Sequence, residues 1–102
     1  MDRLYEIALE KRAQLTKILE NEPYAPDSFA RVGYRIRDGA TLEEDKTKIY
    51  LFISSSEEFV KKADDRLKDV AVVVEGEKAS RIISKIKAEE EAAESGFGSL
   101  FG

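Results

Sequence analysis

The residues that could do chemistry in this chain are charged or hydroxyl-bearing, because the sequence contains no cysteine and no histidine. Their absence excludes the usual zinc ligand sets, disulfides, thiol catalysis and histidine-based acid–base catalysis. No serine, lysine or pair of carboxylates has a recognisable catalytic partner. We therefore expect no catalytic residues, no cofactor and a protein that is not an enzyme, with an active site formed between protomers as the alternative.

Three arginines form the clearest candidate binding surface in the body of the chain. Arg31, Arg35 and Arg37 recur at odd positions of an alternating segment, residues 29–37, together with Phe29. A strand places such side chains on one face, and arginines beside aromatic rings can bind a nucleotide or single-stranded RNA. Two other interpretations stay open. The arginine stems cover the sheet and pair with neighbouring acids, or the face receives the acidic and aromatic C-terminal segment.

A run of three serines at residues 54–56 lies between a predicted strand and a predicted helix, where backbone amides can bind anions. Glu57 and Glu58 follow at once and would repel a phosphate. We therefore expect a helix cap, formed by Ser54 with Glu57 or by Ser55 with Glu58.

The predicted loop over residues 38–46 contains four carboxylates, and hard cations prefer oxygen ligands of this kind. The four are Asp38, Glu43, Glu44 and Asp45. Their spacing differs from that of an EF-hand, and exposed loops are often acidic for solubility alone, so we predict no metal site.

The charge balance argues against a nucleic-acid partner. The 102 residues include 17 Lys and Arg and 21 Asp and Glu, which gives a formal net charge of −4. All of the excess lies in residues 88–102, which hold four glutamates and no basic residue. Nucleic-acid-binding domains usually carry a net basic surface. No apolar run reaches the length of a transmembrane helix, so we expect a cytoplasmic protein with no membrane partner, and the scarcity of Asn and Gln is typical of a thermophile.

Hydrophobic periodicity predicts the elements that position these residues. In chain order they are a helix over 2–21, strands over 29–37 and 47–54, a helix over 57–69, a strand over 70–74 and a helix from near Glu77. The order α-β-β-α-β-α predicts a two-layer α+β fold with a three-stranded mixed sheet covered by helices. We expect one domain over 1–94 and a flexible Gly/Phe-rich tail over 95–102.

The last predicted helix carries its charges in the order that opposes the helix dipole. Its first half is basic and its second half is acidic, whereas the C-terminal end of a helix favours cations. The basic residues are Lys78, Arg81, Lys85 and Lys87. We expect this helix to be firm to about residue 88, to fray afterwards and to end at Ser95-Gly96.

The tail carries three large apolar side chains on a glycine-rich backbone, namely Phe97, Leu100 and Phe101. Disordered termini usually lack aromatic residues, so these side chains need a binding partner or a place in a core. One interpretation is that they fold back onto their own domain. The other is that they dock on a different protein or on another copy of this chain, because an extended peptide with a few anchor residues is a familiar recognition mode.

The spacing Glu94-x-x-Phe97-x-x-Leu100-Phe101 resembles the sliding-clamp-interacting peptide, or PIP box. That motif has a glutamine, two spacers, an aliphatic residue, two spacers and two aromatic residues. The resemblance implies that Phe97, Leu100 and Phe101 would fill the hydrophobic pocket of a sliding clamp, with Glu94 in place of the glutamine. Phe97 departs from the aliphatic position and Leu100 from the first aromatic one. The resemblance is confined to this segment.

Together these patterns predict a small non-enzymatic adaptor or regulatory protein that acts through protein–protein contact, with a C-terminal aromatic docking tail. A sliding-clamp (PCNA) binding protein is the first alternative. RNA or nucleotide binding on the arginine-lined strand face is the second.

Overall fold

The computed structural model describes the backbone of residues 1–101 and the side chains of residues 1–92. Its strands are β1 (Asp2–Ala8), β2 (Arg35–Asp38), β3 (Lys48–Ser54) and β4 (Ala71–Val74). Its helices are the 3₁₀ turn η1 (Leu9–Lys11), α1 (Arg12–Glu20), α2 (Phe29–Val32), α3 (Glu57–Leu67) and α4 (Gly76–Phe101).

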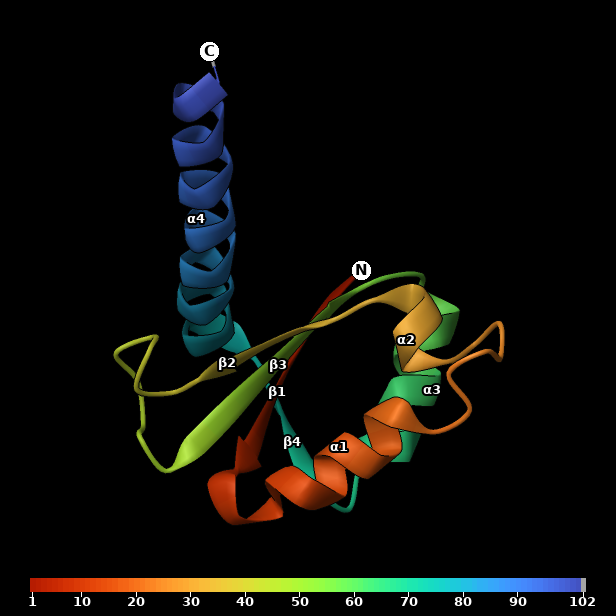
Figure 1. Ribbon diagram of the computed structural model, residues 1–102. Helices are drawn as coiled ribbons and strands as arrows, with labels where there is room; N and C mark the ends of the chain where they lie inside the picture. The colour runs from red at the N-terminus through yellow and green to blue at the C-terminus, as the bar shows by residue number, and fades with distance from the viewer. Residues whose placement is uncertain (102) are drawn as a thin grey trace.

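The predicted α+β class is correct, but the predicted three-stranded mixed sheet is wrong. The sheet has four strands in the order β2-β3-β1-β4, and every neighbouring pair is antiparallel. β1 lies between β3 and β4 and separates the two strands that flank α3 (Figure 1). The connection β1-α1-β2-β3-α3-β4 with this strand order is the split β-α-β arrangement of ferredoxin-like domains. The short α2 is an insertion into it, and α4 is an addition at its end.

The first strand replaces the start of the helix predicted over residues 2–21. Tyr5 and Ile7 contact one layer of helices, Leu4 contacts the opposite layer, and each is at most 1% exposed. A strand that is buried on both faces has no apolar–polar alternation, so its pattern does not distinguish it from a helix. The helical part begins only after the 3₁₀ turn, at Arg12.

The strand predicted over residues 29–37 is also wrong in its first half. Ser28 caps a one-turn helix, α2, by accepting a hydrogen bond from the backbone N–H of Arg31 at 3.1 Å. Gly33 ends that turn at a φ of 93°, a conformation that favours glycine. Phe29 is buried in the core on α2. Neither it nor Arg31 therefore shares a sheet face with the arginines of β2.

The elements after the hairpin agree with the sequence more closely. The predicted helix over 57–69 is α3, which ends at Leu67, and the predicted strand over 70–74 is β4. The predicted caps are wrong by one or two residues, because Ser56 accepts the capping hydrogen bond from Phe59 N–H at 3.2 Å. Gly76 follows β4 at a φ of 71° and starts α4.

Helices cover both faces of the sheet, so the predicted two-layer arrangement is corrected as well. Figure 1 shows α1, α2 and α3 on one side of the sheet and α4 on the other. The larger apolar cluster lies under α1, α2 and α3 and is built around Tyr5, Ile7, Leu51 and Ile53. The smaller cluster lies between the sheet and α4: Leu4, Leu42, Tyr50, Phe52, Ile82 and Ile86. Within the described part of the chain, none of the helices has the length and apolar character needed to cross a membrane.

Candidate functional site: the arginine face and the last helix

The structure brings two of the three predicted arginines together on the α4 side of the sheet. Arg35 and Arg37 lie opposite Phe52 and Tyr50 in the β2–β3 register. Arg31 does not join them, because it lies exposed on α2.

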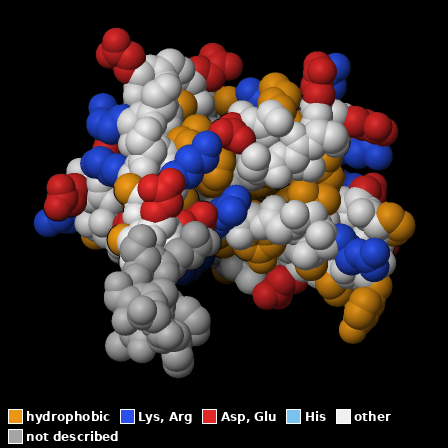
Figure 2. Space-filling model, turned by 90° about the horizontal axis from the view of Figure 1, so that it is seen from above, with side chains coloured by type: hydrophobic (Ala, Val, Ile, Leu, Met, Phe, Trp, Pro, Cys, Tyr) orange, Lys and Arg blue, Asp and Glu red, His pale blue; other side chains and the backbone are white. Residues whose placement is uncertain are grey.

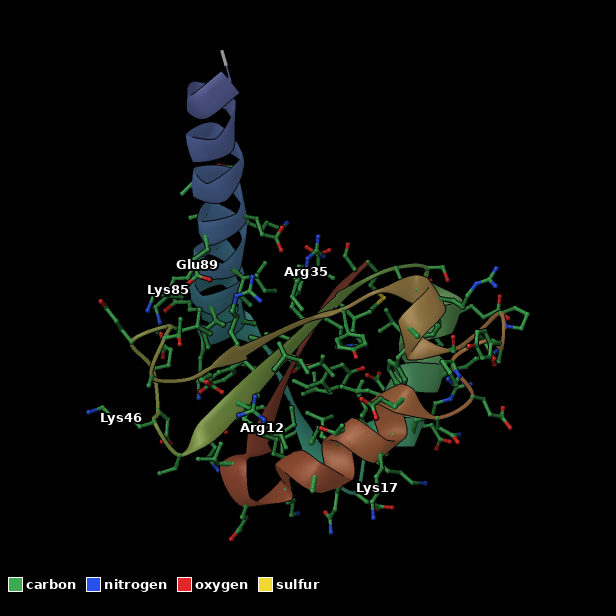
Figure 3. The ribbon with its side chains drawn as sticks, in the orientation of Figure 1. Arg12, Lys17, Arg35, Lys46, Lys85 and Glu89 are labelled. Atoms are coloured by element: carbon green, nitrogen blue, oxygen red, sulfur yellow. The ribbon has the colours of Figure 1, made fainter. Side chains whose placement is uncertain are left out.

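Both β2 arginines are paired with the acidic residues in the middle of α4. The guanidinium Nε of Arg35 lies 2.6 Å from a carboxylate oxygen of Glu90, and that of Arg37 donates to Glu89 at 3.0 Å. Figure 3 shows Arg35 and Glu89 on the same side of the sheet. This geometry agrees with the second interpretation, in which the arginines pair with neighbouring acids, and with the acidic part of the third, because those acids are Glu89 and Glu90.

The aromatic rings beside these arginines do not form an open stacking platform. Phe52 is 1% exposed and Tyr50 is 0% exposed. The guanidinium of Arg35 lies over the Phe52 ring, 5.5 Å from its centroid, and the ammonium of Lys87 lies 5.9 Å from the same centroid. A base would have to displace these cations and the glutamates of α4 before it could stack, so the geometry does not favour the RNA or nucleotide alternative.

The basic first half of α4 is paired with acidic residues of β1 and of the β2–β3 loop. Lys78 donates to Glu6 at 2.7 Å and Lys87 to Asp2 at 3.2 Å. Figure 2 shows basic and acidic side chains intermixed around this helix, with no large patch of one sign. The charge order that opposes the helix dipole is therefore complementary to the surface beneath the helix.

Glu44 is the best-buried carboxylate of this network. Its side chain is 10% exposed and receives hydrogen bonds from Arg81 at 2.8 and 2.9 Å and from Lys85 at 2.9 Å. Lys85 also donates to the backbone carbonyl of Leu42 at 2.7 Å. The hydrogen bonds from Arg81, followed by that from Lys85, lower the pKa of Glu44 to about 2. At neutral pH, Glu44 therefore ties the β2–β3 loop to α4 as an anion.

A second shared carboxylate, Glu6, lies on β1. It accepts hydrogen bonds from Lys78 and from the hydroxyl of Tyr50 at 3.0 Å. Burial alone would raise the pKa of Glu6, but the hydrogen bonds from Lys78 and Tyr50 lower it overall. Burial and the bond to Glu6 raise the pKa of Tyr50. This pair keeps its proton on the tyrosine and has no feature of an acid–base couple poised near neutral pH.

The acidic residues of the predicted loop over 38–46 do not converge on a common point. Asp38 pairs with Arg12 at 3.4 Å, Glu44 faces α4, and Asp45 accepts hydrogen bonds from Thr47. Among the described residues, no group of three acidic, histidine or cysteine side chains is arranged to hold a metal ion.

Sequence patterns missed a polar contact between β1 and α3. The hydroxyl of Tyr5 donates to Asp64 at 2.6 Å, and Arg3 donates to the same carboxylate at 3.0 Å. The adjacent Asp65 lies instead on the exposed face of α3, where it pairs with Lys68 at 3.4 Å.

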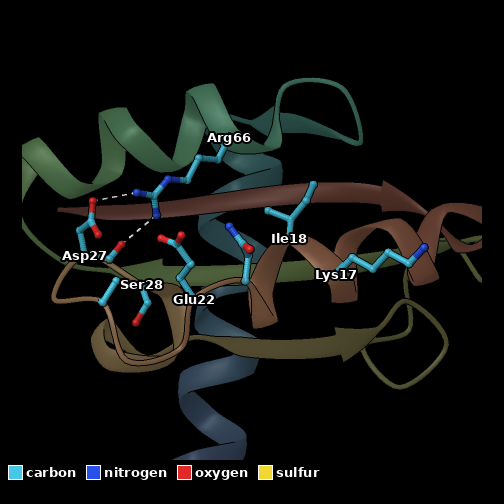
Figure 4. Close-up of a pocket in the computed structure, with 8 residues that line it drawn as sticks. Lys17, Ile18, Glu22, Asp27, Ser28 and Arg66 are labelled. Atoms are coloured by element: carbon cyan, nitrogen blue, oxygen red, sulfur yellow. Dashed lines mark hydrogen bonds and ion pairs between the residues drawn. The ribbon is translucent and has the colours of Figure 1, made fainter.

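A small open cavity lies between the end of α1, the following loop and α3 (Figure 4). It measures about 380 Å³, and its lining includes Lys17, Ile18, Glu22 and Arg66. Arg66 spans one side and donates to the Asp27 carboxylate and carbonyl, both at 2.8 Å. The charged groups that line this cavity already pair with one another or face solvent, so they do not indicate which kind of ligand the cavity would bind.

The predicted partner-binding residues Glu94, Phe97, Leu100 and Phe101 lie outside the described side chains. Their role, and the boundary between a domain over 1–94 and a tail over 95–102, stay predictions. The expected helix end at Ser95-Gly96 is wrong, because the backbone of α4 continues to Phe101. A scan of protein-family models and searches of curated proteins and of solved structures found no match to this chain.

Proposed function

We propose that this protein is a small docking module. Its folded body holds the first half of α4 in a fixed orientation, and the last residues of the chain bind a protein partner. The anchors would be Phe97, Leu100 and Phe101, with Glu94 at the start of the segment. No catalytic step is part of the proposal.

The observation that carries the proposal is where the described core ends along α4. The last residue of either apolar cluster is Ile86, and the last described ion pair of the helix is that of Glu90. On the α4 face, Leu4, Tyr50 and Phe52 are at most 1% exposed with the helix described to this point. This burial supports assigning the aromatic segment to a partner.

The direction of α4 supports the same proposal. The helix starts just after β4. Its first turns lie against the sheet, and the rest of the helix leads away from the sheet (Figure 1). Six side chains of α4 form ion pairs with the sheet or the β2–β3 loop: Lys78, Arg81, Lys85, Lys87, Glu89 and Glu90. A helix that is held at one end in this way can present its other end to a partner at little further cost in ordering.

A photo-crosslinking experiment in the native host tests this proposal. p-Benzoylphenylalanine replaces Phe97 in one full-length protein and the 90%-exposed Tyr24 in a matched control. We expect position 97 to crosslink to a specific second protein and position 24 not to do so. Crosslinks from position 97 that reach only the chain's own sheet or helices would contradict the proposal.

A sliding clamp is the first defined partner to titrate, because the segment resembles a PIP box. Isothermal titration compares the wild type, a triple variant with Phe97→Ala, Leu100→Ala and Phe101→Ala, and a control with Ser95→Ala and Ser99→Ala. A hot-spot anchor is worth about 2 kcal/mol, or about 30-fold in affinity. If even one of the three is a hot spot, the triple variant should bind at least about 30-fold more weakly, and the control should bind normally. If the wild type does not bind the clamp, the clamp is not the partner.

A further inference from the structure

The two edges of the sheet differ in how their backbone groups are satisfied. β2 forms one edge and β4 the other. β4 contains only alanine and valine, and Val72 is 69% exposed on it. Native proteins usually protect such an edge with charges, prolines or a covering segment, because an open edge pairs readily with another strand.

The register shows which backbone groups of β4 face outward. Leu9 N–H donates to Thr47 at 2.9 Å and Ser55 N–H to Met1 at 3.0 Å, so the odd-numbered residues of β1 direct their polar groups to β3. The even-numbered residues of β1 must then direct theirs to β4, where they meet Val72 and Val74. Ala71 and Val73 consequently direct their N–H and C=O groups away from the sheet.

On the β2 edge, the chain itself supplies hydrogen bonds to the outward carbonyls. Gly39 N–H donates to Lys48, which places the outward groups of β2 on Ile36 and Asp38. The carbonyl of Ile36 accepts from the Arg37 guanidinium at 2.9 Å, and that of Asp38 accepts from the loop N–H of Thr41 at 3.1 Å. No described residue makes a comparable bond to the outward groups of Ala71 or Val73.

We propose that β4 pairs antiparallel with β4 of a second copy of this chain, so that the two four-stranded sheets become one continuous sheet. Val72 then lies opposite Val72 of the second copy, and Ala71 lies opposite Val73. This pairing satisfies the outward N–H and C=O groups of both copies equally. It also buries the exposed Val72 side chain against its counterpart on the α4 side.

The charges at the two ends of β4 fit this partner. Lys11, Lys48 and Lys68 lie together around the start of β4, with Asp69 beside them and Asp65 paired to Lys68. Glu75 and Glu77 follow the strand at its other end. Antiparallel pairing about Val72 brings Asp69 opposite Glu75 of the other copy, but it also brings the three lysines to the same glutamates, and this excess of lysine favours a second copy over an unrelated strand.

Sedimentation equilibrium of the full-length chain tests this inference. We expect the wild type to dimerise reversibly. Val72→Lys should raise the dimer dissociation constant at least about 100-fold, because two lysines would meet at the two-fold axis. Tyr24→Lys adds the same charge at a 90%-exposed loop residue and should leave the constant unchanged. A mixture of Val72→Lys and Val72→Glu should form heterodimers.

A wild type that stays monomeric at every concentration would overturn the inference, and so would a dimer that Val72→Lys does not weaken. Hydrogen exchange of the wild type gives a second readout that needs no variant. The Ala71 and Val73 amides should exchange more slowly as the protein concentration rises, and exchange rates independent of concentration would also overturn it. The inference is independent of the docking proposal, because the dimer contact is on β4. The Phe97→Ala, Leu100→Ala, Phe101→Ala variant should therefore dimerise like the wild type.

Discussion

Glu44 shows how a single carboxylate can connect two separate elements of this fold. It comes from the loop between β2 and β3 and receives hydrogen bonds from two cations one turn apart on α4, Arg81 and Lys85. Its side chain is 10% exposed, and three charge-assisted hydrogen bonds converge on it. Spacing alone identified it only as one of four acids in a loop, since its partners lie about 40 residues away in the sequence.

The pKa of Glu44 gives a prediction about stability against pH. Its folded-state pKa, about 2, is below its ordinary value of 4.5, so its ion pairs stabilise the fold above pH 4.5 and are lost as the pH falls toward 2. Urea unfolding should therefore show a smaller loss of stability over this range in Glu44→Gln than in the wild type. At neutral pH the substitution should cost about 1–3 kcal/mol.

Glu43→Gln is the matched control, because Glu43 is the exposed neighbour in the same loop. Its stability should follow the wild-type curve at every pH. Parallel pH curves for the wild type and Glu44→Gln would show that Glu44 does not stabilise the fold in this way.

At the scale of elements, α4 resolves an apparent conflict in the sequence. In an isolated helix, basic residues near the N-terminus and acidic residues near the C-terminus are unfavourable, and each such charge reduces helix stability by about 0.3–1 kcal/mol. In the fold, Glu6 and Glu44 face the basic half, and Arg35 and Arg37 face the acidic residues that follow. The charge order thus complements the surface onto which Ile82 and Ile86 pack.

A double-mutant cycle tests this complementarity. Arg37→Ala and Glu89→Ala should show a coupling free energy of about 0.2–1 kcal/mol in urea unfolding, since their side chains are 29% and 38% exposed. Arg31→Ala with Glu89→Ala is the control pair and should show no coupling, because Arg31 lies on α2. Equal coupling in the two cycles would contradict the role assigned to the β2 arginines.

The elements that the sequence predicts well are those with one clear signal. α3 has a serine before its first turn and one apolar stripe. β3 combines β-branched and aromatic residues, β4 is mostly valine, and Gly76 marks the turn between β4 and α4. β1 gave no such signal because both of its faces are buried. Its pairing with β3 and β4 joins residues far apart in the chain, so the fourth strand and the antiparallel order could not be read from local periodicity.

The candidate site was predictable only in part, for the same reason. Alternation identified Arg35 and Arg37 on one face, and charge complementarity with Glu89 and Glu90 was one of the open interpretations. The separation of Arg31 from that face depends on the cap at Ser28 and the positive φ of Gly33. These two turn-forming residues were present in the sequence as the signal for α2.

At the scale of the whole molecule, the docking proposal requires that the first part of α4 stabilises the fold and that its last residues bind the partner. The described apolar clusters reach Ile86, and ion pairs extend the contact between α4 and the sheet to Glu90. The three anchor residues near the end of the chain should then contribute to partner binding and not to folding. Stability and binding are therefore expected to respond to different parts of one helix.

Thermal unfolding of the full-length triple variant Phe97→Ala, Leu100→Ala, Phe101→Ala tests this claim most directly. Ile82→Ala serves as the control for a residue of α4 that is in the core, because Ile82 is 0% exposed. The control should lose about 2–5 kcal/mol and at least about 8 °C in Tm. We predict that the triple variant unfolds at the wild-type temperature; a loss as large as that of Ile82→Ala would contradict the proposal.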